Sequence, residues 1–179
     1  THAGCSLSSG ESKQPGGEMI VPYMQYIGRQ IIEAIREADA SSQPATITWA
    51  TGRCSLACDR DQKDPKCEGL VIGFDPDAAA DDTLLVGRIT RDNDNAIIGT
   101  IMNYACHPIT LAWQNKLASP DLIGPARILV EANTNGAPCL FLQGASGNLA
   151  PRRQYTGDVR IAEANGKQLG YAVLSTLES

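Results

Sequence analysis

The chain has 179 residues, which is long enough for one domain with a hydrophobic core. Apolar residues make up 42% of the sequence and charged residues 20%, a balance that excludes an intrinsically disordered polypeptide. The net charge is −5 and the sequence contains no basic cluster, which argues against binding to nucleic acid or to an anionic membrane surface. No apolar run is long enough for a transmembrane segment, and no signal peptide is recognisable.

The first elements are predicted from periodicity. Apolar residues at helical spacing predict an amphipathic helix that begins near Pro22 and ends near Ala38. Alternating apolar and polar residues, many of them threonine, predict a strand over 45–50. The stretch from Gly52 to Glu68 is polar and contains cysteines, and we expect a loop there.

Three further strands are expected before the next helix. A short apolar run predicts a strand over 70–74. Two longer runs, over 83–90 and 96–106, flank a polar turn, which is typical of a hairpin. The second of these runs is apolar on both faces, so we place it inside a sheet.

The last part of the chain predicts two helices around one strand. Ser119 or Asp121 can cap a helix that has Pro125 in its first turn and ends near residue 133. A buried strand is expected over 138–142, and a final helix after a cap within 156–158. These elements predict an α/β fold with a layered mixed sheet flanked by helices, in a single domain over residues 1–179.

Six cysteines bear on the cellular compartment. Cys54, Cys58 and Cys67 fall in the expected polar loop, where a disulfide is plausible. A structural zinc site is the alternative, although the spacing of these cysteines fits zinc poorly. Cys106 and Cys139 lie in apolar strands and are predicted to be buried small hydrophobic residues. The even count favours an oxidising compartment, so we expect a secreted or periplasmic protein.

One of the two histidines ends a long apolar run, in the segment Asn103-Tyr104-Ala105-Cys106-His107-Pro108. A histidine at a strand end, followed by proline, presents its imidazole in a fixed direction, as a zinc ligand must. The alternative is a histidine that satisfies a backbone group beside the core. The other histidine, His2, is a candidate only as part of a longer Thr-His segment, because chain ends fray.

A glycine-containing loop, 143–148, follows the expected strand over 138–142. Ligands gather at the carboxyl ends of strands in α/β folds, and glycines let backbone N–H groups approach an oxyanion. The loop nearly matches the nucleophile elbow around Ser146, but Asn148 replaces the second glycine and no histidine follows to act as a base. A serine hydrolase is therefore disfavoured, and a tight connection without catalytic function is the other alternative.

Two further polar residues are weaker candidates when they are considered alone. Arg60 lies in the charged loop, where a solvated surface position is the default interpretation. Asp121 fits a helix cap better than a catalytic acid.

Five segments, in this order along the chain, resemble the catalytic domain of the neutral/alkaline ceramidase family of zinc amidases. Thr1-His2-Ala3-Gly4 looks like the second half of the family's Thr-His-Thr-His-(Ser/Ala)-Gly motif, and 103–108 is similar to its strand ending in a zinc-binding His-Pro. The segment 57–60 is similar to the family's Asn-Arg segment, with Asp59 in place of asparagine. The segment 119–121 resembles a small-x-Asp sequence before a helix, and 143–152 resembles the family's glycine loop.

The resemblance implies a zinc-dependent hydrolase that cleaves an N-acyl amide bond in a lipid or small-molecule substrate. The family's zinc ion is held by two histidines, a glutamate and a tyrosine, and His107 matches one of the ligands. His2 matches a histidine near the metal that assists catalysis, and Arg60 matches an arginine that contacts the substrate. We assign the loop residues Gly144, Ser146 and Asn148 to substrate binding.

Three departures from the family pattern limit this interpretation. The first histidine of the paired motif would precede Thr1, and the glutamate and tyrosine ligands would follow Ser179. We therefore expect a part of a larger enzyme, whose remainder supplies the missing ligands. Asn148 and Ala150 stand where ceramidases have aspartate and serine, which argues against ceramide itself as the substrate. The alternative function is a non-catalytic module that cannot hold metal by itself.

Overall fold

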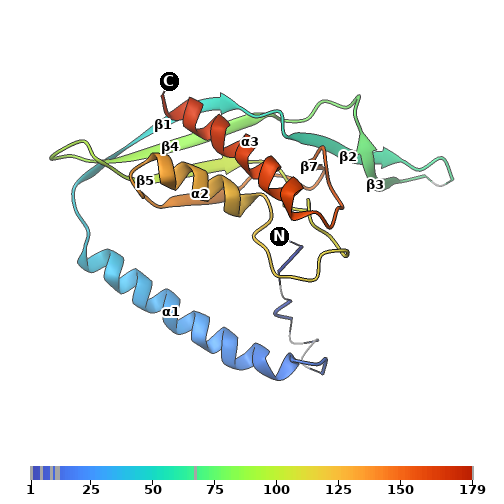
Figure 1. Cartoon of the computed structure of the whole chain (residues 1–179), viewed down its shortest axis with the longest axis horizontal. Coiled ribbons are helices and arrows are strands. Elements are labelled where there is room, and N and C mark those ends of the chain that lie inside the picture. The colour runs from blue at the N-terminus through green and yellow to red at the C-terminus, as the bar shows by residue number, and fades with distance from the viewer. Residues whose placement is uncertain (1, 5, 9, 11–12, 67, 179) are drawn as a thin grey trace. The chain divides into compact units, whose positions relative to one another are not determined.

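The structure is a computed structural model that describes residues 2–4, 6–8, 10, 13–66 and 68–178 (Figure 1). The chain divides into two compact units, one of residues 1–4 and 45–179 and one of residues 5–44. Each unit is described below by itself.

The smaller unit consists mainly of one helix. The short 3-10 helix η2 (Gly17–Met19) leads into α1 (Ile20–Ala40), which confirms the helix predicted from periodicity. No residue of α1 is buried, and its apolar face includes Tyr23, Ile31 and Ile35. The helix is therefore amphipathic, and its apolar face is not buried within its own unit.

The larger unit is built on a four-stranded sheet with the order β1-β4-β5-β6. Its strands are β1 (Ala45–Arg53), β4 (Thr83–Arg91), β5 (Ile97–Tyr104) and β6 (Cys139–Gln143). The first two pairings are antiparallel and the β5–β6 pairing is parallel, so the sheet is mixed. As predicted, β5 lies inside the sheet.

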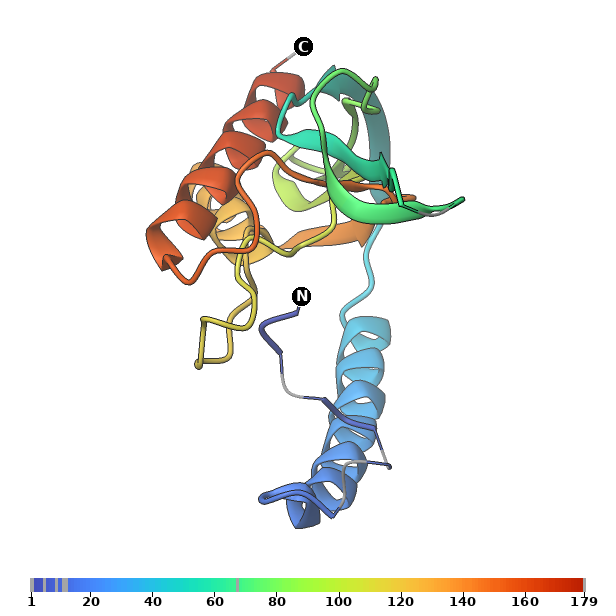
Figure 2. The ribbon, with the colours of Figure 1, turned by 90° about the vertical axis from the view of Figure 1, so that its right-hand side faces the viewer.

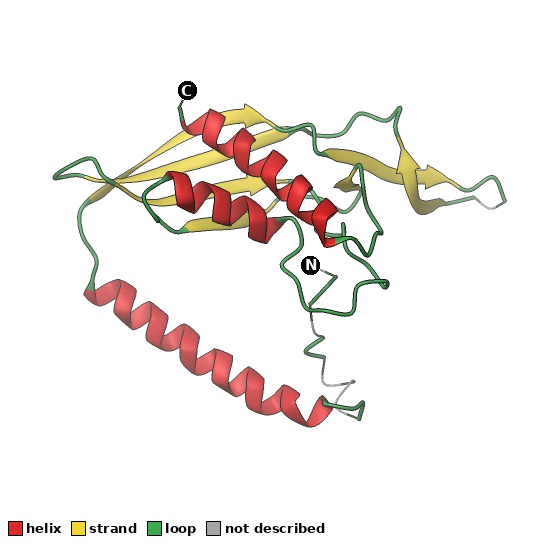
Figure 3. Ribbon diagram, in the orientation of Figure 1, coloured by secondary structure: helices red, strands yellow, loops and turns green. Residues whose placement is uncertain are grey.

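Two helices, α2 (Ile123–Asn133) and α3 (Val159–Leu177), cover one face of this sheet (Figures 1 and 3). The core between them contains side chains that are almost entirely removed from solvent, and it includes Leu84, Val86, Met102, Leu169 and Val173. Figure 2, turned by 90°, shows the helices on one side of the strands. The predicted α/β fold, a layered mixed sheet flanked by helices, is confirmed.

The two helices approach each other closely at a glycine. A Cβ atom on Gly166 of α3 would lie 2.5 Å from the carbonyl oxygen of Leu122, a backbone atom that cannot move aside freely. Glycine at this position lets the two helices lie closer together than a residue with a side chain would allow.

A second sheet has the order β3-β2-β7, and two of its strands were not predicted. Its strands are β3 (Leu70–Asp75), β2 (Ala57–Lys63) and β7 (Leu149–Pro151), all paired antiparallel. The prediction of a loop over 52–68 was wrong, because β2 occupies the middle of this stretch. The prediction failed because charged residues such as Asp59 and Arg60 usually indicate an exposed loop. In the structure both are buried and make hydrogen bonds.

The cysteines of the described chain are buried free thiols: Cys54, Cys58, Cys106 and Cys139. No disulfide therefore joins Cys54 to Cys58, and Cys67 lies outside the described residues. Burial raises the pKa of the Cys106 thiol far above its ordinary value, so the thiol stays protonated and packs as an apolar side chain. The predicted burial of Cys106 and Cys139 is confirmed.

Within the described residues, no helix is long and apolar enough to cross a membrane.

Tyr104 connects the two sheets through its hydroxyl group. The phenol is completely buried at the end of β5, donates a hydrogen bond to the Cys54 carbonyl at 2.6 Å and accepts one from the Ala57 N–H at 3.0 Å. Ala57 begins β2, so this single oxygen fixes the start of the second sheet against the end of the first.

We expect Tyr104→Phe to lower the free energy of unfolding by about 1–3 kcal/mol, because it leaves a buried N–H and a buried carbonyl without their partner. Urea denaturation measures this difference. Tyr171→Phe is the matched control, since Tyr171 is 60% exposed on α3 and should tolerate the change. Equal effects of the two substitutions would contradict the role of the Tyr104 hydroxyl.

Candidate functional site

The candidate site lies where β5 and β6 end. Because these strands are parallel, their carboxyl ends meet at one edge of the sheet, which places His107 and the loop 143–148 together. The Gly144 N–H donates to the Tyr104 carbonyl at 3.0 Å, and the His107 N–H donates to the Leu149 carbonyl at 2.8 Å. The backbone on both sides of the loop is thereby fixed to the segment that carries His107.

Glycine is required at the start of this loop. A Cβ atom on Gly144 would lie 2.9 Å from the backbone nitrogen of Ala105. A larger residue would push the loop away from the segment that leads to His107.

The structure brings the two histidines into contact. The Nε2 atoms of His2 and His107 are 2.8 Å apart, and their ring centroids are 4.9 Å apart. The His2 N–H also donates to the Pro108 carbonyl at 3.4 Å, so the N-terminal segment follows the His-Pro turn. One ring nitrogen must donate and the other accept, so at least one of the two imidazoles is neutral in this arrangement.

The environment of His107 favours its neutral form. Burial is the main cause that lowers the pKa of His107, followed by the positive charge of Arg60 and by His2. A hydrogen bond with the backbone of Ser146 acts in the opposite direction, which identifies that backbone group as an acceptor. A neutral imidazole with one nitrogen bound to the protein can offer the lone pair of the other.

Arg60 is buried, contrary to the default expectation of a surface position. Only 7% of the residue is exposed, and its Nε and Nη2 atoms donate to the Gly147 carbonyl at 3.0 and 2.7 Å. Its backbone N–H donates to the Asn148 carbonyl at 2.9 Å. Arg60 thus holds the glycine loop against β2.

Asp59 and Asn148 form a second link between β2 and this loop. Asn148 Nδ2 donates to Asp59 Oδ2 at 2.6 Å, and Asp59 Oδ1 accepts from the Asp61 N–H at 2.7 Å. Asp59 stands where the family resemblance has asparagine, and Asn148 where it has aspartate. The two departures therefore compensate each other, because the pair still consists of one carboxylate and one amide.

Ser146 is not arranged as a catalytic nucleophile. Its hydroxyl oxygen accepts a hydrogen bond from Gln143 Nε2 at 2.7 Å, and the same amide group donates to the Cys106 carbonyl at 3.1 Å. Gln143 was not predicted as a site residue, and no pattern in the sequence distinguishes it from a surface amide.

Asp121 shapes the neighbouring loop and is not the helix cap that the sequence suggested. The residue before α2 is Leu122, and no side chain caps that end. Asp121 has a positive φ of 53° and its buried carboxylate accepts from the N–H groups of Leu111 and Leu122, at 2.8 and 2.6 Å. It closes the loop between β5 and α2, and the Ser119 N–H at the end of that loop donates to the Ala3 carbonyl at 2.8 Å.

The described residues contain no group of three or more histidine, cysteine, aspartate or glutamate side chains that could hold a metal ion. The site therefore offers two imidazoles, a buried guanidinium and a glycine loop.

We expect Arg60→Met to lower the free energy of unfolding by about 2 kcal/mol or more, because the Gly147 carbonyl loses both of its charged donors. Amide exchange in 144–148 should accelerate, which hydrogen–deuterium exchange measures. Arg53→Met is the control, since the Arg53 side chain is 79% exposed although it pairs with Asp82. Unchanged exchange in the loop of Arg60→Met would show that Arg60 does not hold it.

Comparison with known proteins supports the fold. The sequence matches no known family profile. It also matches no curated protein. Among solved structures, the chain is similar to the neutral ceramidase from Pseudomonas aeruginosa, with a TM-score of 0.64 and 19% identity over 83% of this chain. It is also similar to a ceramidase complexed with C2, with a TM-score of 0.63 and 18% identity over 80% of this chain.

The chain spans about a quarter of the length of these structures, 25% of the first and 24% of the second. The similarity in fold extends over most of this chain but over a minor part of theirs. The chain has the fold of a part of a neutral ceramidase, which confirms the family resemblance at the level of fold.

Proposed function

We propose that this chain is part of a zinc-dependent hydrolase that cleaves an N-acyl amide bond in a lipid or small-molecule substrate. The observation that carries the proposal is the contact between His2 and His107, whose Nε2 atoms lie 2.8 Å apart beside the glycine loop. The ceramidase-like fold supports the reaction class, and the departures at Asn148 and Ala150 leave the substrate open.

The donor chemistry of the two histidines fits zinc. Imidazole nitrogen is among the preferred ligands of this metal, and it binds in the neutral form that the surroundings of His107 favour. In this proposal His107 is a ligand, His2 lies beside the metal, and further ligands come from the rest of the parent protein. Zinc bound there would act as a Lewis acid that polarises the amide carbonyl or an attacking water.

The residues of this chain orient the reacting groups. The Ser146 backbone and the Leu149 carbonyl fix the imidazole and the backbone of His107. A neutral His107 that donates to the Ser146 backbone accepts from His2 at Nε2, so His2 carries the proton at its own Nε2 and can donate it.

Arg60 can bind the substrate only with part of its guanidinium group. Two of its five N–H groups are directed to the Gly147 carbonyl, so three remain for a substrate carbonyl or hydroxyl group. Substrate contact by Arg60 is therefore compatible with its role in holding the loop.

The loop residues would act through shape as well as contact. The N–H of Gly144 is already donated to Tyr104, so Gly144 contributes close approach and not a donor. Ser146 and Asn148 have side chains that hold the loop in place, and their substrate contacts would use the groups that remain.

The expected secreted or periplasmic location stays a prediction. The four described cysteines are free thiols, so they add no support to an oxidising compartment.

Zinc content tests the proposal. The purified chain should bind zinc, and His107→Ala should weaken binding by more than the roughly 10–100-fold that loss of an outer partner causes, whereas His2→Ala should weaken it by no more than that. Elemental analysis and competition with a chromogenic chelator measure this. Cys139→Ala is the control, because it removes a potential ligand at the opposite end of β6 and leaves both histidines.

A wild-type chain without zinc would favour the alternative, a module that cannot hold metal by itself. Labelling by a fluorophosphonate probe separates the other alternative, a serine hydrolase. We expect no labelling, and labelling that Ser146→Ala abolishes would instead support that class.

A further inference from the structure

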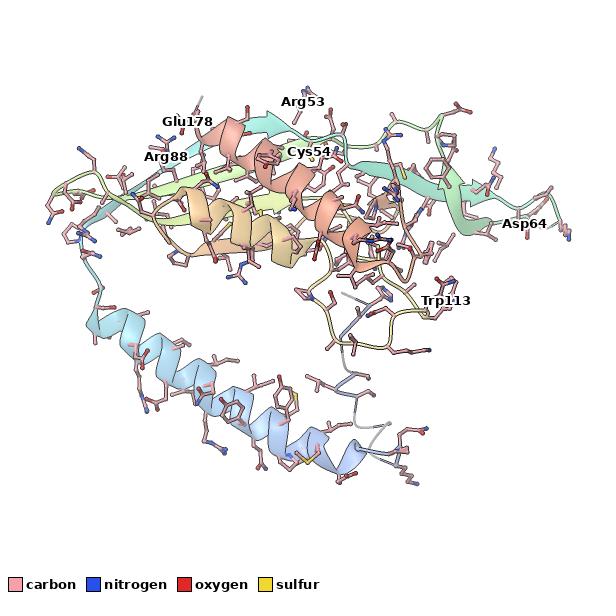
Figure 4. All side chains as sticks on the ribbon, in the orientation of Figure 1. Arg53, Cys54, Asp64, Arg88, Trp113 and Glu178 are labelled. Carbon is pink, nitrogen blue, oxygen red and sulfur yellow. The ribbon has the colours of Figure 1, made fainter. Side chains whose placement is uncertain are left out.

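The loop between β5 and α2 carries the most exposed aromatic side chain of the described chain. Trp113 is 68% exposed and Leu117 is 75% exposed, and Figure 4 shows Trp113 on this loop at the margin of the larger unit. The Trp113 ring stacks on Tyr155 with a centroid distance of 5.6 Å and an interplanar angle of 28°. We call Trp113, Leu117 and Tyr155 the aromatic tip.

The aromatic tip is held by hydrogen bonds on both sides. The Lys116 ammonium donates to the Trp113 carbonyl at 2.9 Å, and the Gly157 N–H donates to Gln114 Oε1 at 3.2 Å. A parallel bridge between Leu111 and Thr156 joins the loop to the segment that carries Tyr155. Two large apolar side chains are thus exposed on a loop that is hydrogen-bonded to the segment carrying Tyr155.

The charge around the aromatic tip differs from that of the whole chain. The two segments that meet here, 109–120 and 149–157, contain Lys116, Arg152 and Arg153 and no acidic residue, whereas the chain has a net charge of −5. The three cationic side chains are exposed. The bridge between Leu111 and Thr156 joins the two segments, so cations that are far apart in the sequence belong to one region of the fold. Asp158, directly after the second segment, is paired with Arg160.

We propose that the aromatic tip docks on a lipid surface that contains anionic headgroups. Tryptophan and tyrosine prefer the interface between headgroups and hydrocarbon, and a leucine at the same tip can enter the acyl region. Lysine and arginine beside them are attracted to anionic lipids, by about fivefold in affinity for each cation. The loop also ends at Ser119, which is bonded to the residue after His2, so docking brings a bilayer close to the candidate site.

Vesicle sedimentation tests this proposal without any measurement of hydrolysis, so its failure is distinguishable from failure of the proposed function. The chain should bind vesicles of equal parts phosphatidylcholine and phosphatidylglycerol, and bind pure phosphatidylcholine vesicles at least about fivefold more weakly. Trp113→Ala/Leu117→Ala should weaken binding to the mixed vesicles by about tenfold or more. Lys116→Glu should reduce the preference for anionic vesicles.

The matched control is Ile128→Ala/Tyr171→Ala, which removes two exposed apolar side chains of α2 and α3, 68% and 60% exposed. Its vesicle binding should stay within about twofold of the wild type. Circular dichroism melts establish that all variants fold, and wild-type tryptophan emission should shift to shorter wavelength with vesicles, but not in Trp113→Phe.

Three results would overturn the proposal: no vesicle binding by the wild type, equal binding to both vesicle types, or equal losses in the tip and control variants. The proposal would also be overturned if Trp113→Ala/Leu117→Ala left the vesicle affinity unchanged and raised the KM for a monomeric short-chain amide. The aromatic tip would then contact substrate.

Discussion

The hydrogen bonds from Arg60 to the Gly147 carbonyl are the interaction on which the candidate site depends. Only 7% of the Arg60 residue is exposed, and a buried charge without hydrogen-bond partners is strongly destabilising. The Gly147 carbonyl accepts from two of the five guanidinium N–H groups, and Asp59 of the same strand accepts from Asn148, so two charged side chains of β2 are bonded to the loop. The second sheet therefore serves the site: β2 carries the cation, β7 continues the loop, and their pairing aligns the two.

The link between Asp59 and Asn148 shows why the family motifs are better compared as contacts than as single positions. Each residue alone is a departure from the ceramidase pattern. Together they form a short hydrogen bond between a carboxylate of β2 and an amide of the loop. The departure at Ala150 has no such partner: Ala150 is buried in β7 and pairs with Cys58.

The sequence predicted those elements whose burial follows a simple period. The strands of the main sheet and the three long helices of the described residues lie where the pattern placed them. The strand over 138–142 was wrongly predicted to be buried, because β6 is at the edge of its sheet and exposes Leu140 and Leu142. The second sheet was missed because β2 buries Asp59 and Arg60, residues whose type indicates exposure. Asp121 was misjudged for a related reason, since its positive φ and its bond to Leu111 depend on a loop closure that no local pattern encodes. The contact between His2 and His107 spans 105 positions, and only the family resemblance anticipated that these histidines belong to one site.

Arg60 couples the shape of the site to the protonation of His107. Its positive charge lowers the pKa of His107, and its hydrogen bonds hold the loop whose Ser146 backbone accepts from the same imidazole and raises that pKa. The first effect favours a neutral ring, and the second fixes which way the neutral ring points. A lysine at position 60 would keep the charge but could not direct two parallel N–H groups at one carbonyl. Burial remains the main cause of the lowered pKa of His107, and Arg60 adds to it while its hydrogen bonds hold the loop, so one side chain contributes to both charge and geometry at the site.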